Sequence, residues 1–111
     1  MGNEINLRTG LADKMEVVGQ IFEIDGLPEL LGKYEAGMDT VKFNAVTIQV
    51  SSLLLRKNKA LADRIIAMTL EETDESVQEM DDGTYAAALR NAIIKDVLGF
   101  FASSPRTAGQ K

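Results

Sequence analysis

The chain of 111 residues contains no cysteine and no histidine. Without cysteine it can form neither a disulfide framework nor a thiolate metal site, which fits a reducing cytoplasm. Without histidine it lacks the commonest general base, the commonest metal ligand and the usual nucleophile pairs of serine and cysteine enzymes. Neither glycine-rich motif that binds nucleotides is present. We therefore expect a protein that is not an enzyme and that has no cofactor or metal site.

Long apolar runs are also missing. No uninterrupted run approaches the roughly 20 residues that span a bilayer. The opening residues, MGNEINLRTG, lack the apolar segment of a signal peptide. We therefore expect a soluble, cytoplasmic protein that has no membrane partner.

Basic side chains are outnumbered by acidic ones, 12 to 17, which gives a formal net charge of −5. A phosphate backbone would be repelled on average, so we expect no nucleic-acid partner. One local basic cluster comprises Arg56, Lys57, Lys59 and Arg64. We interpret it as a solvated junction between two helices rather than a phosphate-binding patch.

Hydrophobic residues make up 45% of the chain and aromatic residues only 5%. An aliphatic core rich in leucine, alanine and methionine favours helix, and this length suits one domain. The sequence predicts a mainly α fold, a small single-domain bundle of four to five helices. We expect a flexible N-terminal segment over residues 1–14, a helical domain over 15–103 and a flexible C-terminal tail over 104–111, where Pro105 cannot continue a helix.

Residues 15–25 are ambiguous because they are rich in β-branched side chains. Val18, Phe22 and Ile24 alternate as in a strand, but helical spacing also links the apolar residues from Val17 onwards. The Asp-Gly pair that follows ends the segment in either case. We predict a short N-terminal strand or extended segment here.

The remaining chain predicts helices that begin at recognisable residues. Pro28 stands near the start of one, and Asp39 and Asn58 offer side-chain oxygens to the next two. The expected helices cover residues 27–37, 39–58, 58–72 and 83–104, with a short helix over 74–80.

The helix over 39–58 carries two apolar stripes, so we expect it to be buried on two sides as the central helix. One stripe comprises Val41, Ala45, Ile48, Ser52 and Leu55, and the other comprises Phe43, Val46, Val50 and Leu54. The apolar arc of the last helix is also wider than one neighbouring helix needs, so part of it can meet another chain. The residues predicted to bind a partner are Phe43, Val46, Val50, Leu54, Ile94, Leu98 and Phe101.

The stretch EETDESVQEMDDG, residues 71–83, carries seven carboxylates and no basic side chain. It does not fit a Ca²⁺ loop, because placing Gly83 at the sixth position puts Met80 and Leu89 where oxygen ligands are required. A pair of carboxylates acting as in a glycosidase would need a cleft and aromatic neighbours, which a polar run does not supply.

A structural role accounts for most of these carboxylates. Thr73 can cap a short helix that Val77 and Met80 anchor to the core, and Asp81 or Asp82 can cap the last helix. Acidic residues in the first turn favour the positive helix end. The outward side remains a candidate acidic surface for a partner, comprising Glu71, Glu72, Asp74, Glu75 and Glu79.

In its layout the chain resembles the small tail assembly chaperones of long-tailed bacteriophages and prophages. The resemblance covers residues 15–103. It rests on the helix GLPELLGKYEAG, the long helix DTVKFNAVTIQVSSLLLRKN, the acidic connector and the closing helix TYAAALRNAIIKDVLGFF. The family has no invariant catalytic motif, so the resemblance assigns no site residues.

The resemblance implies a chaperone in the host cytoplasm that coats the helical tape measure protein and keeps it soluble until tail tube subunits polymerise round it. It also implies a homo-oligomer and, for many members, a second, frameshifted product. Two other classes remain open on the residues alone. One is an acidic helical adaptor or regulator for a basic protein partner, and the other is an enzyme that uses the carboxylates of residues 71–79.

Overall fold

In the computed structural model, residues 2–100 are described, with side chains from residue 10 onwards. Over this range the chain forms six α-helices and one π-helical turn, without a strand. The predicted mainly α fold is confirmed. The predicted tail over residues 104–111 lies outside the described residues. Within the described part, no helix combines the length and the apolar character needed to cross a membrane.

The first helix, α1 (Gly2–Phe22), corrects a prediction about the N-terminal part of the chain, because the strand expected over 15–25 is wrong. The segment over 1–14, which was expected to precede the helical domain, is helical from Gly2. Val17, Val18 and Ile21 are buried, and the helix packs on α4. This helical spacing prevails over the strand preference of β-branched residues because burial of one face decides the local structure.

A short helix, α2 (Leu27–Leu31), follows Gly26, which has a φ of 89° that favours glycine. Leu27 and Leu31 are buried against the core. The helix ends well before residue 37, where the sequence placed its end, because Gly32 is a poor helix residue. Beyond it, the Tyr34 hydroxyl lies 2.7 Å from Oγ1 of the buried Thr47.

The third and fourth helices, α3 (Thr40–Lys57) and α4 (Lys59–Leu70), begin at the predicted caps. The Asp39 carboxylate accepts a hydrogen bond from the Lys42 backbone N–H at 2.8 Å, and the Asn58 side chain accepts one from Leu61 at 3.2 Å. Each oxygen satisfies an N–H group that the helix itself cannot pair.

The central helix is α4, not α3 as the sequence suggested. It contacts α1, α3, α5 and α6. Its buried residues are Leu61, Ala62, Asp63, Ile65, Ile66 and Ala67. The small side chains of Ala62 and Ala67 let neighbouring helices approach closely. The helix ends at Glu71, which adopts the left-handed conformation (φ 60°) that glycine usually supplies at this position.

The acidic connector forms α5 (Asp74–Gln78), and the chain then enters α6 (Asp82–Ala92). A π-helical turn, η1 (Ile93–Val97), continues α6 without a break in the helical path. Leu89, Ile93 and Val97 are all buried. These residues recur every four positions, which is longer than the α-helical period of 3.6, and the wide turn keeps them in the core.

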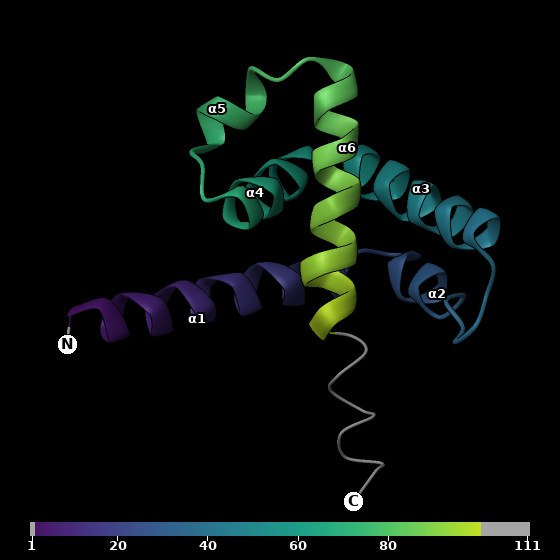
Figure 1. Ribbon diagram of the computed structural model, residues 1–111, viewed down its shortest axis with the longest axis horizontal. Coiled ribbons are helices and arrows are strands. Elements are labelled where there is room, and N and C mark those ends of the chain that lie inside the picture. Colours follow the sequence, from purple (N-terminus) through teal and green to yellow (C-terminus); the bar gives the residue numbers. More distant parts are fainter. Residues whose placement is uncertain (1, 101–111) are drawn as a thin grey trace, which may run out of the picture.

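Figure 1 shows α6 and η1 as one upright helix, with α4 and α5 on one side and α3 on the other. Helix α1 runs below α4, and its first turns extend past the other helices, while α2 lies beneath α3. One cluster of aliphatic side chains forms the core where these helices meet.

The two faces of α3 provide a test of this arrangement. We expect Leu54→Ala to lower the free energy of unfolding by about 2–5 kcal/mol, because Leu54 is fully buried. The matched change Ile48→Ala should alter it by less than about 0.5 kcal/mol, because Ile48 is 63% exposed. Urea unfolding followed by circular dichroism measures both, and equal losses would contradict the assignment of the two faces.

Candidate functional site

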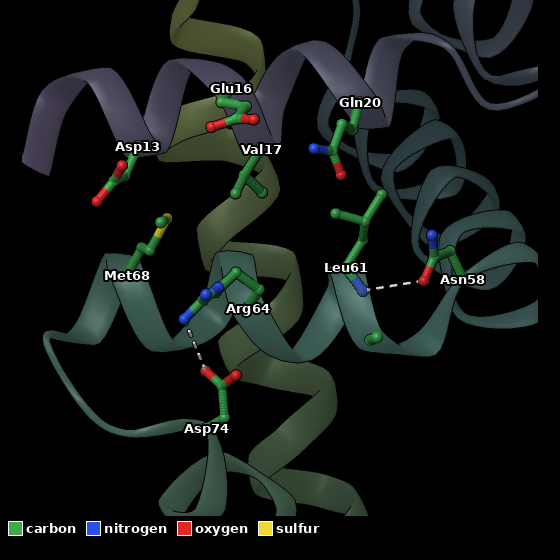
Figure 2. Close-up of a pocket in the computed structure, with 10 residues that line it drawn as sticks. Asp13, Glu16, Val17, Gln20, Asn58, Leu61, Arg64, Met68 and Asp74 are labelled. Atoms are coloured by element: carbon green, nitrogen blue, oxygen red, sulfur yellow. Dashed lines mark hydrogen bonds and ion pairs between the residues drawn. The ribbon is translucent and has the colours of Figure 1, made fainter.

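A groove of about 550 Å³ lies between α1 and α4 and is called here the α1–α4 groove. Figure 2 shows side chains from α1 pointing towards α4, with Leu61 and Met68 pointing back from α4. Its lining comprises Asp13, Glu16, Val17, Gln20, Asn58, Ala60, Leu61, Arg64, Met68 and Asp74.

The groove combines an apolar base with an acidic edge. Its apolar base includes Val17 and Leu61, each only 8% exposed. The carboxylates of Asp13 and Glu16 stand on the α1 side and are exposed. The one cation in the lining, Arg64, lies 3.7 Å from the Asp74 carboxylate across an exposed ion pair. Neither Asp13 nor Glu16 forms an ion pair with another described side chain, so this acidic edge suits a cationic side chain.

The only buried charged side chain in the described part of the chain is Asp63, which is 4% exposed. The Tyr85 hydroxyl donates to its carboxylate at 2.5 Å, and Lys59 pairs with it at 3.1 Å. The same lysine lies 5.7 Å from the centroid of the Tyr85 ring. Each group of this cluster is paired with another, so we assign it the structural role of fixing α6 on α4.

A second polar cluster joins α1, α4 and η1. Lys14 pairs with Asp96 at 3.3 Å, and the Thr69 hydroxyl contacts the other oxygen of the same carboxylate. Side chains of Lys14 and Asp96 are 28% and 13% exposed. The sequence reasoning missed both clusters, because each depends on a residue distant in the chain: Tyr85 is 22 residues from Asp63, and Lys14 is 82 residues from Asp96.

The structural role proposed for the acidic stretch is confirmed at its two helix starts. Thr73 accepts from the Ser76 backbone N–H at 3.0 Å, and Asp81, rather than Asp82, accepts from Thr84 at 2.7 Å. Hydrogen bonding from Thr84, chiefly from its backbone N–H, holds the pKa of the Asp81 carboxyl below its usual value. Val77 is fully buried and Met80 packs against the core, as predicted.

The five carboxylates of the predicted acidic surface do not converge on one point. Glu71 caps the end of α4 through its backbone N–H and not through its carboxylate. Glu72 accepts a hydrogen bond from Ser76, and Asp74 faces Arg64. Glu75 and Glu79 are exposed. Among the described residues, no three His, Cys, Asp or Glu side chains are grouped so that they could hold a metal ion.

Three of the seven residues predicted to bind a partner are buried, so the structure corrects the sequence hypothesis for those three. Val46, Val50 and Leu54 are buried in the core because this stripe of α3 faces α4 and α6. Phe43 is half-buried, with its ring centroid 5.2 Å from that of Tyr34. Ile94 and Leu98 are half-buried, and Phe101 lies outside the described residues.

Four of the five residues of the other α3 stripe are exposed, while the fifth, Leu55, is half-buried against the core. Val41 is 78% exposed and Ile48 is 63% exposed, and both Ala45 and Ser52 are also exposed. We call these four residues the α3 outer stripe. The sequence contained this stripe, but its periodicity could not tell which of the two stripes faces the core.

The N-terminal helix exposes a smaller apolar pair. Leu11 and Met15 are 52% and 53% exposed and lie one helical turn apart. With Val41 and Ile48 of the α3 outer stripe, they are the most exposed large apolar side chains among the described residues. Leu70 follows at 39% exposed.

Comparison with known proteins identifies no relative: no family model matches the chain, and no curated protein or solved structure is significantly similar to it.

The cap at the start of α5 gives a prediction for the acidic stretch. We expect Thr73→Ala to lower the free energy of unfolding by about 1 kcal/mol, because the Ser76 N–H loses its acceptor. The control Glu75→Gln changes an exposed residue of the same helix and should have an effect within about 0.5 kcal/mol. Thermal unfolding of both variants provides the comparison, and a larger effect of the glutamine variant would argue against the structural role.

The Tyr85–Asp63 pair predicts a stability change at alkaline pH. Burial, the hydrogen bond to Asp63 and the negative charge of Asp63 raise the pKa of Tyr85 above its ordinary value of 10.0. The unfolded chain therefore ionises this tyrosine first. The stability contribution is complete below pH 10 and is lost as the pH rises from there towards the higher pKa of the folded state.

We expect the free energy of unfolding of the wild type to fall more steeply between pH 9 and 11 than that of Tyr85→Phe. The difference in slope should be at most about 1.4 kcal/mol per pH unit. Part of the slope should remain in the variant, since burial also raises the pKa of Tyr34. Urea titrations at each pH measure it, and parallel slopes would refute the assignment.

Proposed function

We propose that the protein is a non-catalytic binding protein that holds an α-helical segment of a protein partner. The observation that carries this proposal is the α3 outer stripe, where Val41 and Ile48 stand open to solvent on the side of α3 opposite its buried residues. Aliphatic side chains that recur on one face of a rigid helix offer the kind of surface against which an amphipathic helix packs.

The specific role that we propose is that of a phage tail assembly chaperone. Such a protein would bind the helical tape measure protein, keep it soluble and help the tail tube assemble. The support is the resemblance in layout, the small helical bundle and an exposed apolar surface suited to a helical client. Self-association and contact with tail tube subunits belong to the same proposal.

The test is co-expression of the chain with a long helical tape measure protein, followed by affinity purification. We expect Val41→Asp combined with Ile48→Asp to weaken the association by tenfold or more, because the apolar contact is replaced by charge. Both positions are exposed, so the variant should keep the circular dichroism spectrum and thermal midpoint of the wild type.

The matched control is Ala36→Asp combined with Ala87→Asp, which adds the same charge at two exposed positions outside the stripe. The control should bind as the wild type does. Equal binding by both double variants would exclude the α3 outer stripe as the binding surface. Absence of any association with the tape measure protein would refute the chaperone role itself.

The second candidate function is an acidic adaptor for a basic protein, which the carboxylates of Asp13 and Glu16 along the α1–α4 groove favour. The two candidates differ in their response to salt. Binding of a basic partner should weaken steeply between 50 and 500 mM NaCl, whereas apolar helix packing should persist. The same co-purification at several salt concentrations separates them.

A further inference from the structure

The α3 outer stripe has the residue spacing of a coiled-coil seam. Val41, Ala45, Ile48 and Ser52 are separated by four, three and four residues. This alternation of three and four is the seven-residue repeat by which two helices pack side chains into each other's gaps. Large residues alternate with small ones along it, so a second helix could place its own large side chains over Ala45 and Ser52.

The buried side of α3 is already occupied. Val46, Val50 and Leu54 are 8%, 0% and 0% exposed, so the helix is anchored to the bundle by the face opposite the stripe. A partner helix could therefore lie along the outer stripe without opening the core. The stripe from residue 41 to residue 52 is about 16 Å long at 1.5 Å per residue, which calls for about two heptads of partner helix.

The charges beside the stripe are of one sign. Helix α3 contains no acidic residue in a chain that has 17 of them. On one side of the stripe, the exposed residues at seven-residue intervals are Lys42, Gln49 and Arg56. On the other side, Asn44 accepts a hydrogen bond from Arg90 of α6 at 2.7 Å. In a coiled coil these flanking positions select the partner through charge.

We propose that the α3 outer stripe binds an amphipathic helix of another protein whose apolar seam follows the same heptad repeat and whose flanking positions carry carboxylates. The inference rests on the proposed function and adds to it the chemistry of the helix that is held. A second copy of this chain fits less well. Helix α3 of a second copy carries no carboxylate, so pairing two α3 helices would leave Lys42 and Arg56 without an acidic partner on the facing helix.

The test uses the full chain and two synthetic peptides of three heptads, each labelled with fluorescein. Both carry leucine at the two apolar positions of every heptad. One has glutamate at all flanking positions and the other has lysine there, so each peptide disfavours its own self-pairing. Fluorescence anisotropy measures the dissociation constants at 50 and 300 mM NaCl.

We expect the glutamate peptide to bind at least tenfold more tightly than the lysine peptide at 50 mM NaCl. Val41→Asp with Ile48→Asp should weaken that binding at least tenfold. Lys42→Glu with Arg56→Glu, which leaves the apolar stripe intact, should reverse the preference between the two peptides. The last variant keeps the test decisive if the aspartate variant is destabilised.

Equal affinity for the two peptides would overturn the proposal. So would binding of the glutamate peptide that is unchanged by both double variants, because the peptide would then lie elsewhere, for example in the α1–α4 groove. Light scattering that shows a dimer lost in Val41→Asp with Ile48→Asp would make a second copy the occupant and would also overturn it.

The outcomes separate this inference from the proposed function. A tape measure protein that co-purifies while neither peptide binds would leave the chaperone role standing. It would refute the proposed preference for carboxylates at the flanking positions of the partner helix. Selective binding of the glutamate peptide, without any association with a tape measure protein, would support the α3 outer stripe as a binding surface for an acidic amphipathic helix. It would refute the role in tail assembly.

Discussion

Burial of α4 on nearly every side is the constraint on which the rest of the bundle depends. Four other α-helices must reach this helix, and each contributes one apolar face to it. A carboxylate at Asp63 within such a helix is costly unless it is paired and hydrogen-bonded. Lys59 and Tyr85 meet that requirement, so the position of α6 on α4 is set by polar contacts as well as by apolar packing.

The parts of the fold that could be predicted from the sequence are those with local causes. The caps at Asp39, Asn58, Thr73 and Asp81 each involve an oxygen and a backbone N–H three residues later. Such contacts depend on the local residues and not on the rest of the fold. For that reason an acidic stretch that looked like a site could be interpreted as helix starts before its surroundings were known.

The parts that could not be predicted depend on which surfaces meet. The sequence of residues 15–22 fits either a strand or a helix. Packing on α4, which buries Val17, Val18 and Ile21, favours the helix. The two stripes of α3 share the helical period, and the period alone does not tell which stripe is buried. The packed bundle shows that Val50 faces inward and Ile48 outward. The candidate binding surface is therefore a property of the tertiary structure, although all its residues were visible in the sequence.

The π-helical turn Ile93–Val97 has a consequence for the register of the last helix. In a regular α-helix that continued from Leu89 and Ile93, the next residue on the buried face would be Asp96. The wider turn adds one residue and brings Val97 to that place, while Asp96 moves to the edge, where Lys14 meets it. The helix therefore turns apolar side chains to the core both before and after the π-helical turn, although no single regular α-helical repeat would place both sets there.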